Sequence, residues 1–292
     1  MQTKRQIQQL LESAGVRPNK RFGQHFLIDL NLMRLLVDSA NIQTNDVVLE
    51  VGCGTGSLTG ILAEKAGRVI AVELDGKLIE IAGNQLGKNK NIDFINSDIL
   101  ENKRTINQTV ARTLKTARER NSGRLLLVAN LPYSIASPLI LNLITGPTIT
   151  DAIFVTVQKE VAGRMIAVPN TKEYSILSIF LAATGVVKMI RKLKPSVFWP
   201  QPQVDSVMVS FKFDLMKARR IKNMELFGEI VSFFMGHRRK TLIACSRLTH
   251  KRLQKKYNWS EIFRKCAIDP KKRPDHISSN DYIDIANYIE KT

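Results

Sequence analysis

The stretch VVLEVGCGTGSLTG, residues 47–60, joins a mostly apolar run to three glycines and then to the start of a helical pattern. Gly52, Gly54 and Gly56 follow the run directly, in the pattern GxGxG. Glycines between a strand and a helix let a ligand approach the backbone closely. A dinucleotide-binding fingerprint would place its third glycine at Ser57 instead. The stretch therefore predicts a strand, a ligand-binding loop and a helix, which is the first unit of an α/β fold.

Short apolar runs alternate with helical patterns on both sides of this stretch. Such alternation is typical of βαβ units and predicts a doubly wound, mostly parallel sheet. Before it, Leu32, Leu35, Leu36 and Ser39 are expected to share the face of a helix. The expected strands are 47–51, 69–73, 92–95, 125–129 and 152–157, with 186–193 and 205–213 as a closing hairpin.

The chain after about residue 216 has a different pattern, with amphipathic helices expected at 224–234, 242–253 and 282–289. Residues 217–292 contain 18 Lys or Arg against 8 Asp or Glu. We therefore predict two domains, 1–215 with the sheet and 216–292 as a small basic helical domain.

Two basic segments are interpreted separately. The polar residues 101–124, with seven basic and two acidic side chains, are interpreted as a surface insertion that is partly helical. Arg238, Arg239 and Lys240 closely follow an apolar run, so we expect them to emerge at a helix end and face the catalytic cleft.

The overall charge indicates a polyanionic partner. The 292 residues include 44 Lys or Arg and 26 Asp or Glu, a formal net charge of +18. Nucleic acid is the expected partner, with a solvated basic surface as the alternative. No apolar run is long enough to span a membrane, and the N-terminus lacks a signal-peptide core, so no membrane role is expected.

Cysteine and histidine usage points to a reducing compartment without a metal site. The three cysteines have no CxxC spacing, and the four histidines are scattered. We therefore expect a cytoplasmic protein with neither a disulfide framework nor a bound metal.

Two acidic residues stand at the ends of the strands that follow the glycine loop. Glu73 closes the second strand, where a carboxylate can accept hydrogen bonds from both ribose hydroxyls of an adenosine cofactor. Asp98 follows the third strand, where it can bind an adenine amino group. The cofactor is then S-adenosylmethionine or NAD, and the glycine spacing favours S-adenosylmethionine.

The segment VANLPYSIASPLI, residues 128–140, places a polar motif at the end of another buried strand. The side-chain oxygen of Asn130 and the carbonyl of Leu131, fixed by the following Pro132, can each accept one N–H of an adenine amine. Holding that amine in line with a sulfonium methyl makes its nitrogen a better nucleophile. Tyr133 is expected to stack on the base.

The chain carries five co-linear motifs that resemble those of the ribosomal RNA adenine N6,N6-dimethyltransferases, and the likeness runs from about Arg17 to the C-terminus. The likeness is greatest to the branch that dimethylates two adjacent adenosines near the 3′ end of small-subunit rRNA. It implies a class I (Rossmann-like) methyltransferase fold, S-adenosylmethionine as donor, S-adenosylhomocysteine as product, a role in ribosome biogenesis, and a helical C-terminal domain that grips RNA. We expect a monomer that binds small-subunit rRNA or a precursor subunit. The motifs are RFGQHFLID (21–29), EVGCGTGSLT (50–59), NLPY (130–133), QKEVAGRM (158–165) and FWPQPQVDSV (198–207).

The resemblance also implies residue roles. Phe198 matches the aromatic residue that packs on the flipped target base opposite the tyrosine. His25 stands where Asn is common, so its contact can be through its backbone only. Cys53 stands where Pro is common. The positions that match the family's cofactor contacts are His25, Leu27, Gly52, Glu73, Asp98 and Asn130.

Other functions are compatible with parts of the pattern. Dimethylation of large-subunit rRNA, as in macrolide resistance, is the nearest alternative, and a nucleic-acid-binding factor of the same fold without catalysis is the second. A DNA adenine methyltransferase usually has a proline where Leu131 stands. A dehydrogenase would need a His or Tyr-Lys hydride site, which the sequence lacks.

Overall fold

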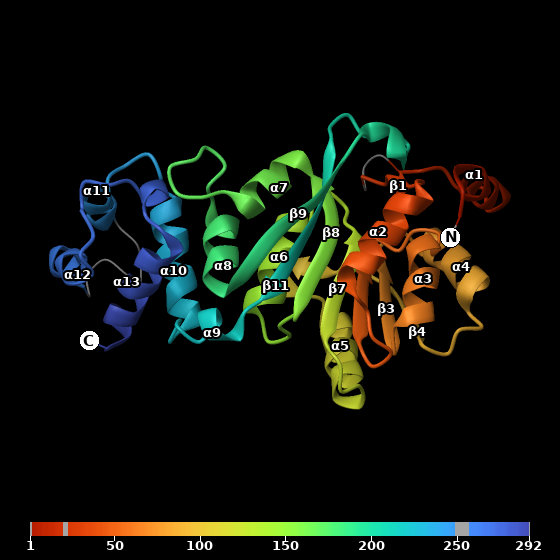
Figure 1. The fold of residues 1–292 in the computed structure, drawn as a ribbon, viewed down its shortest axis with the longest axis horizontal. Coiled ribbons are helices and arrows are strands. Elements are labelled where there is room, and N and C mark those ends of the chain that lie inside the picture. The colour runs from red at the N-terminus through yellow and green to blue at the C-terminus, as the bar shows by residue number, and fades with distance from the viewer. Residues whose placement is uncertain (1, 20–22, 249–256, 292) are drawn as a thin grey trace. The chain divides into compact units, whose positions relative to one another are not determined.

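The computed structural model describes residues 2–19, 23–248 and 257–291, drawn in colour in Figure 1. The chain forms two compact units, Met1–Ala162 with Lys188–Lys212, and Gly163–Val187 with Phe213–Thr292. The domains predicted from the sequence place residues 163–187 in the first domain. In the structure this segment joins the second unit, because its helix α8 (Ile176–Thr184) packs against three C-terminal helices.

A seven-stranded sheet forms the centre of the first unit and confirms the α/β class. Its order is β4-β3-β2-β7-β8-β11-β9. The pairs β2–β3, β3–β4, β2–β7 and β7–β8 are parallel, and β11 is antiparallel to β8. The expected hairpin strands β9 and β11 are neighbours at the sheet edge. The bounds are β2 Val47–Val51, β3 Arg68–Glu73, β4 Ile92–Asn96, β7 Leu125–Asn130, β8 Ala152–Gln158, β9 Gly185–Leu193 and β11 Ser206–Phe213.

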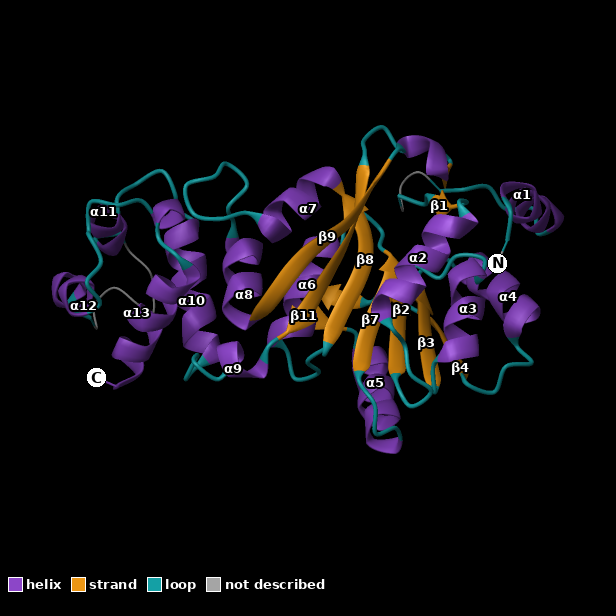
Figure 2. Cartoon of the chain, in the orientation of Figure 1, coloured by secondary structure: helices purple, strands orange, loops and turns teal. Residues whose placement is uncertain are grey.

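Helices cover both faces of the sheet, with α2 (Leu30–Ala40) in front of the strands and α5 (Gln108–Arg120) behind them in the view of Figure 2. The helices α3 (Ser57–Lys65), α4 (Gly76–Leu86) and α6 (Ala136–Thr145) also belong to this unit. The helix expected around Leu32–Ser39 is present as α2, but the four residues expected to share one face are not buried together. Leu36 is buried, Leu32 and Ser39 are partly buried, and Leu35 is exposed, because the helix turns Met33, Leu36, Val37 and Ala40 toward the core.

Residues 101–124 are partly helical, as expected, but the interpretation of this segment as a surface insertion is wrong. The strands β5 (Leu100–Asn102) and β6 (Thr105–Ile106) form a small hairpin, and α5 follows it. Val110, Leu114 and Ala117 of α5 are buried, and the helix packs on β2 and β3. The segment is thus one of the layers that cover the sheet.

The N-terminal helix α1 (Lys4–Ser13) is an element that the sequence pattern did not predict. It starts with a capping box between Thr3 and Gln6, and it buries Ile7 and Leu11 against Leu78 and Ile81 of α4. The chain then forms the short strand β1 (Phe26–Leu27), which pairs with β10 (Phe198–Trp199).

The second unit is helical, as expected for the C-terminal part. Its core is aromatic, and Phe234 packs edge-on against both Trp259 and Phe263. The helix expected at 242–253 ends at Ser246, and its residues 249–253 lie outside the described residues. The elements are α8, α9 (Leu215–Ala218), α10 (Met224–Met235), α11 (Leu242–Ser246), α12 (Trp259–Lys265) and α13 (Ser279–Lys291), preceded by α7 (Lys159–Ile166), which ends in this unit.

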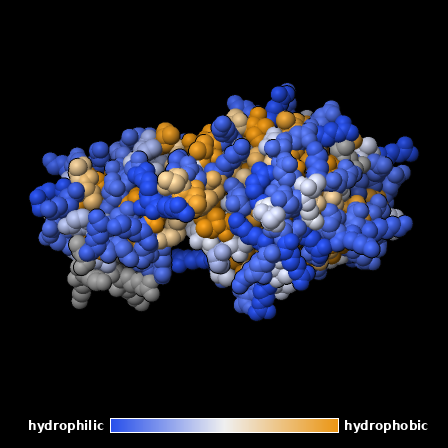
Figure 3. Space-filling view, turned by 60° about the horizontal axis from the view of Figure 1, so that its bottom comes forward, coloured by the Kyte–Doolittle hydropathy of each residue, from blue (hydrophilic) through white to orange (hydrophobic). Residues whose placement is uncertain are grey.

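The basic cluster after α10 is only partly free for a ligand. Arg238 forms an ion pair with Asp275 at 3.1 Å and donates a second hydrogen bond to the carbonyl of Lys172. Arg239 and Lys240 are exposed. Hydrophilic residues cover most of the face seen in Figure 3. Within the described part of the chain, no helix has the length and apolar character needed to cross a membrane.

Candidate active site

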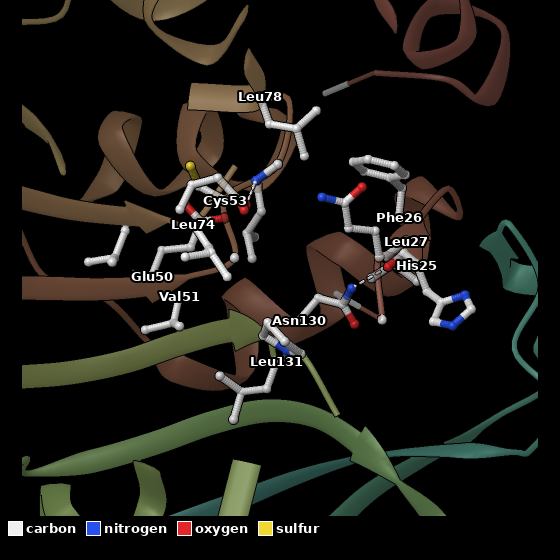
Figure 4. A pocket seen from close by; sticks show the side chains of 18 of the residues that line it. His25, Phe26, Leu27, Glu50, Val51, Cys53, Leu74, Leu78, Asn130 and Leu131 are labelled. Atoms are coloured by element: carbon white, nitrogen blue, oxygen red, sulfur yellow. Dashed lines mark hydrogen bonds between the residues drawn. The ribbon is translucent and has the colours of Figure 1, made fainter. Parts of the chain in front are cut away.

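A cavity in the first unit opens where the parallel strands end. The carboxyl ends of β2, β3, β4 and β7 all contribute to it, as Figure 4 shows for β2 and β7. Carboxyl ends of parallel strands are the usual ligand site of an open α/β sheet. The predicted residues that line this cavity are His25, Leu27, Gly52, Glu73, Asp98, Asn130, Leu131, Pro132 and Tyr133.

Two positions of the glycine loop require glycine, because each lies close to the ring of another residue. Gly52 has φ +78°, and a Cβ there would lie 3.1 Å from the ring of Pro132. Gly54 has φ +57°, and a Cβ there would lie 2.9 Å from the ring of Phe26. Both positions combine a left-handed backbone with a close neighbour, so a side chain at either would close this end of the cavity.

Glu73 connects the glycine loop to the end of β3. Its Oε2 accepts the Gly54 N–H at 2.9 Å, and its Oε1 accepts the Asp75 N–H at 3.1 Å. Burial raises the pKa of the Glu73 carboxyl, although these backbone hydrogen bonds oppose the rise. Each carboxylate oxygen keeps a further lone pair for a ligand. Asp98, at the end of β4, is exposed and accepts the Leu100 N–H at 2.9 Å.

Glu50 is a buried carboxyl that the sequence pattern did not single out. It lies on β2, lines the cavity, and is 2% exposed. Its Oε2 has no hydrogen-bond partner. Burial raises the pKa of Glu50 to about 8, and the charge of Glu73 acts in the same direction. Burial, with both carboxylates nearby, also raises the pKa of the Cys53 thiol, so this cysteine is not a thiolate nucleophile.

The side chain of Asn130 is held from two sides. Its Nδ2 donates to the backbone carbonyl of His25 at 2.7 Å, the dashed line in Figure 4. Its Oδ1 accepts a hydrogen bond from the hydroxyl of Thr156. Since a carbonyl only accepts, the first contact fixes which end of the amide carries the nitrogen. The amide is thereby oriented before any substrate binds.

Two aromatic rings meet beside this amide. The rings of His25 and Tyr133 are stacked with centroids 5.4 Å apart. The Tyr133 hydroxyl is 2.9 Å from that of Ser206, which is fully buried. Nδ1 of His25 donates to the carbonyl of Pro200 at 2.6 Å. Both rings are therefore tied to segments of the chain near β10 and β11.

Phe198 is the predicted site residue that does not line the cavity. It is 1% exposed and belongs to the core cluster with Leu27 and Leu36. The ring that stacks on Tyr133 in this structure is that of His25.

Several lining residues were not predicted from the sequence. Gln2 anchors the start of the chain to the glycine loop with two hydrogen bonds. Its backbone N–H donates to the Ser57 hydroxyl at 2.9 Å, and its side-chain Nε2 donates to the Thr55 carbonyl at 3.0 Å. The Thr3–Gln6 capping box followed by apolar Ile7 and Leu11 is a sequence signal that could have revealed the helix there. The lining residues without a prediction include Ile7, Phe26, Glu50, Leu74, Leu78 and Ile99.

Two solved structures with a similar fold are methyltransferases. A dimethyladenosine transferase from Plasmodium falciparum superposes with a TM-score of 0.73 at 24% identity, covering 90% of this chain and 96% of that one. A 23S rRNA methyltransferase gives a TM-score of 0.62 at 19% identity, with 91% and 99% covered. The chain thus has the Rossmann-like methyltransferase fold expected from its motifs.

Sequence comparison identifies the family. The ribosomal RNA small subunit methyltransferase A of Clostridium perfringens is 35% identical over 283 residues, 97% of this chain and 94% of that protein. The protein of the same name from Bacillus pumilus is 32% identical over 285 residues, with 97% and 95% covered. The family model described as ribosomal RNA adenine dimethylase matches residues 15–291. With a cavity of this composition at its strand ends, the chain belongs to the ribosomal RNA adenine dimethylase family.

Proposed function

We propose that this protein transfers methyl groups from S-adenosylmethionine to N6 of adenosine in small-subunit rRNA, twice on each of two adjacent adenosines near the 3′ end. The observation that carries the proposal is the Asn130 amide, oriented from both sides, in the same cavity as the glycine loop and Glu73. The name shared by the bacterial relatives supports the small subunit as the source of the RNA.

The cavity fits an adenosine cofactor. Glu73 would accept the ribose hydroxyls, and Asp98 would accept the adenine amino group. Gly52 and Gly54 leave open the space that a Cβ would fill, and the partnerless Oε2 of buried Glu50 offers an acceptor to a polar group of the cofactor. His25, Leu27 and Asn130 would complete the contacts. S-adenosylmethionine, when bound, supplies a methyl group on a positively charged sulfur.

The chain's own residues would prepare the adenine amine for attack. Its lone pair is delocalised into the ring, so the amine is a weak nucleophile. Oδ1 of Asn130 and the carbonyl of Leu131 would each accept one N–H and hold the nitrogen in line with the methyl group. Pro132 stiffens the backbone after that carbonyl. The methylated nitrogen is acidic enough to lose its proton to water, so no strong general base is required.

The target base must leave the RNA stack to reach this position. Tyr133 would stack on the flipped base, and its tie to Ser206 holds the ring for that contact. Phe198 is buried in the core here, so a second contact from this residue to the base stays a prediction. The basic residues of both units would bind phosphates. Monomeric state and cytoplasmic location also stay predictions.

Two other functions make different predictions. A large-subunit enzyme would use the same chemistry on different RNA, so only the substrate distinguishes it. A non-catalytic RNA-binding factor would not need the oriented amide. The two hydrogen bonds that orient Asn130 therefore favour an enzyme over a binding factor.

Transfer of labelled methyl groups tests this function. Purified protein is incubated with labelled S-adenosylmethionine and with small or large ribosomal subunits that lack the modification. We expect label in the small-subunit RNA only, and little with Asn130→Ala. Equal label with Asn130→Ala, or label confined to the large subunit, would contradict the proposal.

A further inference from the structure

Thr156 lies next to the proposed catalytic motif although it is 26 residues from Asn130 in sequence. It is on β8, directly opposite Asn130 of β7 in the parallel register. The residue is fully buried, with 0% of its surface exposed. A buried hydroxyl in the middle of a sheet costs free energy unless it is hydrogen-bonded.

Thr156 contacts both groups that would accept the adenine amine. Its hydroxyl donates to Oδ1 of Asn130. Its backbone carbonyl accepts the N–H of Leu131 at 3.2 Å. The side chain of the first acceptor and the peptide of the second are thus tied to one residue of the neighbouring strand.

The hydrogen bond from Thr156 leaves Oδ1 of Asn130 free to accept one more hydrogen bond. A hydroxyl has one hydrogen, and an amide oxygen accepts two hydrogen bonds. Thr156 therefore occupies one lone pair of Oδ1 and leaves the other for an N–H of the substrate. With the Nδ2 end bound to the His25 carbonyl, rotating the amide by 180° would set its oxygen against that carbonyl. Removing the hydroxyl would leave the amide held at one end only.

We propose that Thr156 is a positioning residue for methyl transfer: it holds the Asn130 amide and the Leu131 peptide so that both acceptors face the amine of the target adenine. The inference rests on the proposed function, because it assigns a role only if these two groups accept the amine. It predicts that loss of the hydroxyl slows the chemical step and leaves binding nearly unchanged.

The test compares Thr156→Val with Thr156→Ser. Valine keeps the shape and removes the hydroxyl, whereas serine keeps the hydroxyl. We expect kcat of Thr156→Val to fall by about 10- to 100-fold, with KM for the RNA and the Kd of S-adenosylmethionine within about twofold. Thr156→Ser should retain kcat within about threefold of the wild type.

Thr150→Val is the matched control. Thr150 is equally buried in the same unit, and its hydroxyl donates to the Leu143 carbonyl at 2.9 Å, away from the cavity. This variant should lose a comparable amount of thermal stability and keep its kcat. If Thr156→Val is too unstable, the pair Thr156→Ala and Thr156→Ser makes the same comparison at a smaller residue.

The outcomes separate this inference from the proposed function. Wild-type kcat in Thr156→Val, equal losses in Thr156→Val and Thr150→Val, or no recovery in Thr156→Ser would overturn the positioning role while methyl transfer by the wild type stands. Absence of methyl transfer by the wild-type protein would overturn the proposed function, and the positioning role with it.

Discussion

Glu73 and Asn130 lie in one cavity but bind different partners. Glu73 uses part of its hydrogen-bonding capacity on the backbone of the glycine loop. Asn130 is held by His25 and Thr156, and one lone pair of its side-chain oxygen remains for a substrate. Substituting the first should therefore affect cofactor affinity, and substituting the second should affect the chemical step.

Glu73→Ala should weaken S-adenosylmethionine binding. The change removes the charged acceptor proposed for the ribose hydroxyls and also frees the Gly54 N–H. We expect a loss on the order of 1–3 kcal/mol of binding free energy, measured by calorimetry. Glu64→Ala, an exposed carboxylate of α3, is the control and should bind normally. Unchanged affinity in Glu73→Ala would show that the carboxylate does not contact the cofactor.

Glu50→Gln should change the pH dependence of stability. The pKa of Glu50 is about 8 in the fold against 4.5 in the unfolded chain, so the folded state keeps a proton that the unfolded state releases between these values. The free energy of unfolding of the wild type should therefore fall as pH rises through this window, and the amide should remove that loss.

The difference between the two proteins isolates Glu50. At pH 9 the variant should be more stable by on the order of 5 kcal/mol, since the shift from 4.5 to about 8 spans about 3.5 pKa units and each unit corresponds to about 1.4 kcal/mol. At pH 4 the two should be similar. Urea unfolding of the cofactor-free proteins at both pH values measures this, with Glu64→Gln as the exposed control. A difference that does not grow with pH contradicts the raised pKa.

At the scale of elements, the sequence predicts the strands well and the helices less well. Strands buried on both faces form continuous apolar runs, which is why β2, β7 and β8 are predicted with nearly correct ends. Helix α5 was not predicted as a sheet layer because only Val110, Leu114 and Ala117 are buried among polar neighbours. For α2, leucines on two adjacent faces made the choice of buried face ambiguous.

The residues of the candidate site that lie at strand ends could be predicted from the sequence. Gly52, Glu73, Asp98 and Asn130 each follow an apolar run, and parallel pairing brings them together. Thr156 and Ser206 were not predicted, because their roles depend on register between strands, which no local pattern carries.

The helix α1 should affect cofactor binding through its buried face. Ile7 and Leu11 pack in the same cluster, but only Ile7 lines the cavity. Both Ile7→Ala and Leu11→Ala should lower stability by about 2–4 kcal/mol through the space left behind. Ile7→Ala should also weaken cofactor binding by about 1–2 kcal/mol, as calorimetry on the folded variants would show. Equal cofactor affinities of Ile7→Ala and Leu11→Ala would mean that α1 forms no part of the binding surface.

At the scale of the whole molecule, the charge of +18 is expected to act through phosphate contacts. The cluster at residues 238–240 has two roles. Arg238 is paired with Asp275 within the second unit, so its substitution would confuse folding with binding. Arg239 and Lys240 are exposed, and they are the better test of RNA binding.

The double variant Arg239→Glu, Lys240→Glu should weaken RNA binding and reduce its salt dependence. Each phosphate that the variant no longer neutralises lowers the slope of log affinity against log salt by about 0.7–0.9. Affinity measured at several salt concentrations gives the slope. Lys88→Glu with Lys90→Glu, exposed in the turn after α4, is the control with the same change in net charge. Equal slopes for the two double variants would indicate a general charge effect and no RNA binding at 239–240.

The proposed dimethylation of adenine in small-subunit rRNA depends most on the oriented amide at the end of β7. Mass spectrometry of rRNA fragments, after reaction of unmodified ribosomal subunits with the protein and S-adenosylmethionine, tests this dependence most directly. We expect N6,N6-dimethyladenosine at two adjacent positions near the 3′ end of the small-subunit RNA, and its loss with Asn130→Ala. Dimethyladenosine only in the large-subunit RNA, or in neither RNA, would contradict the proposed function.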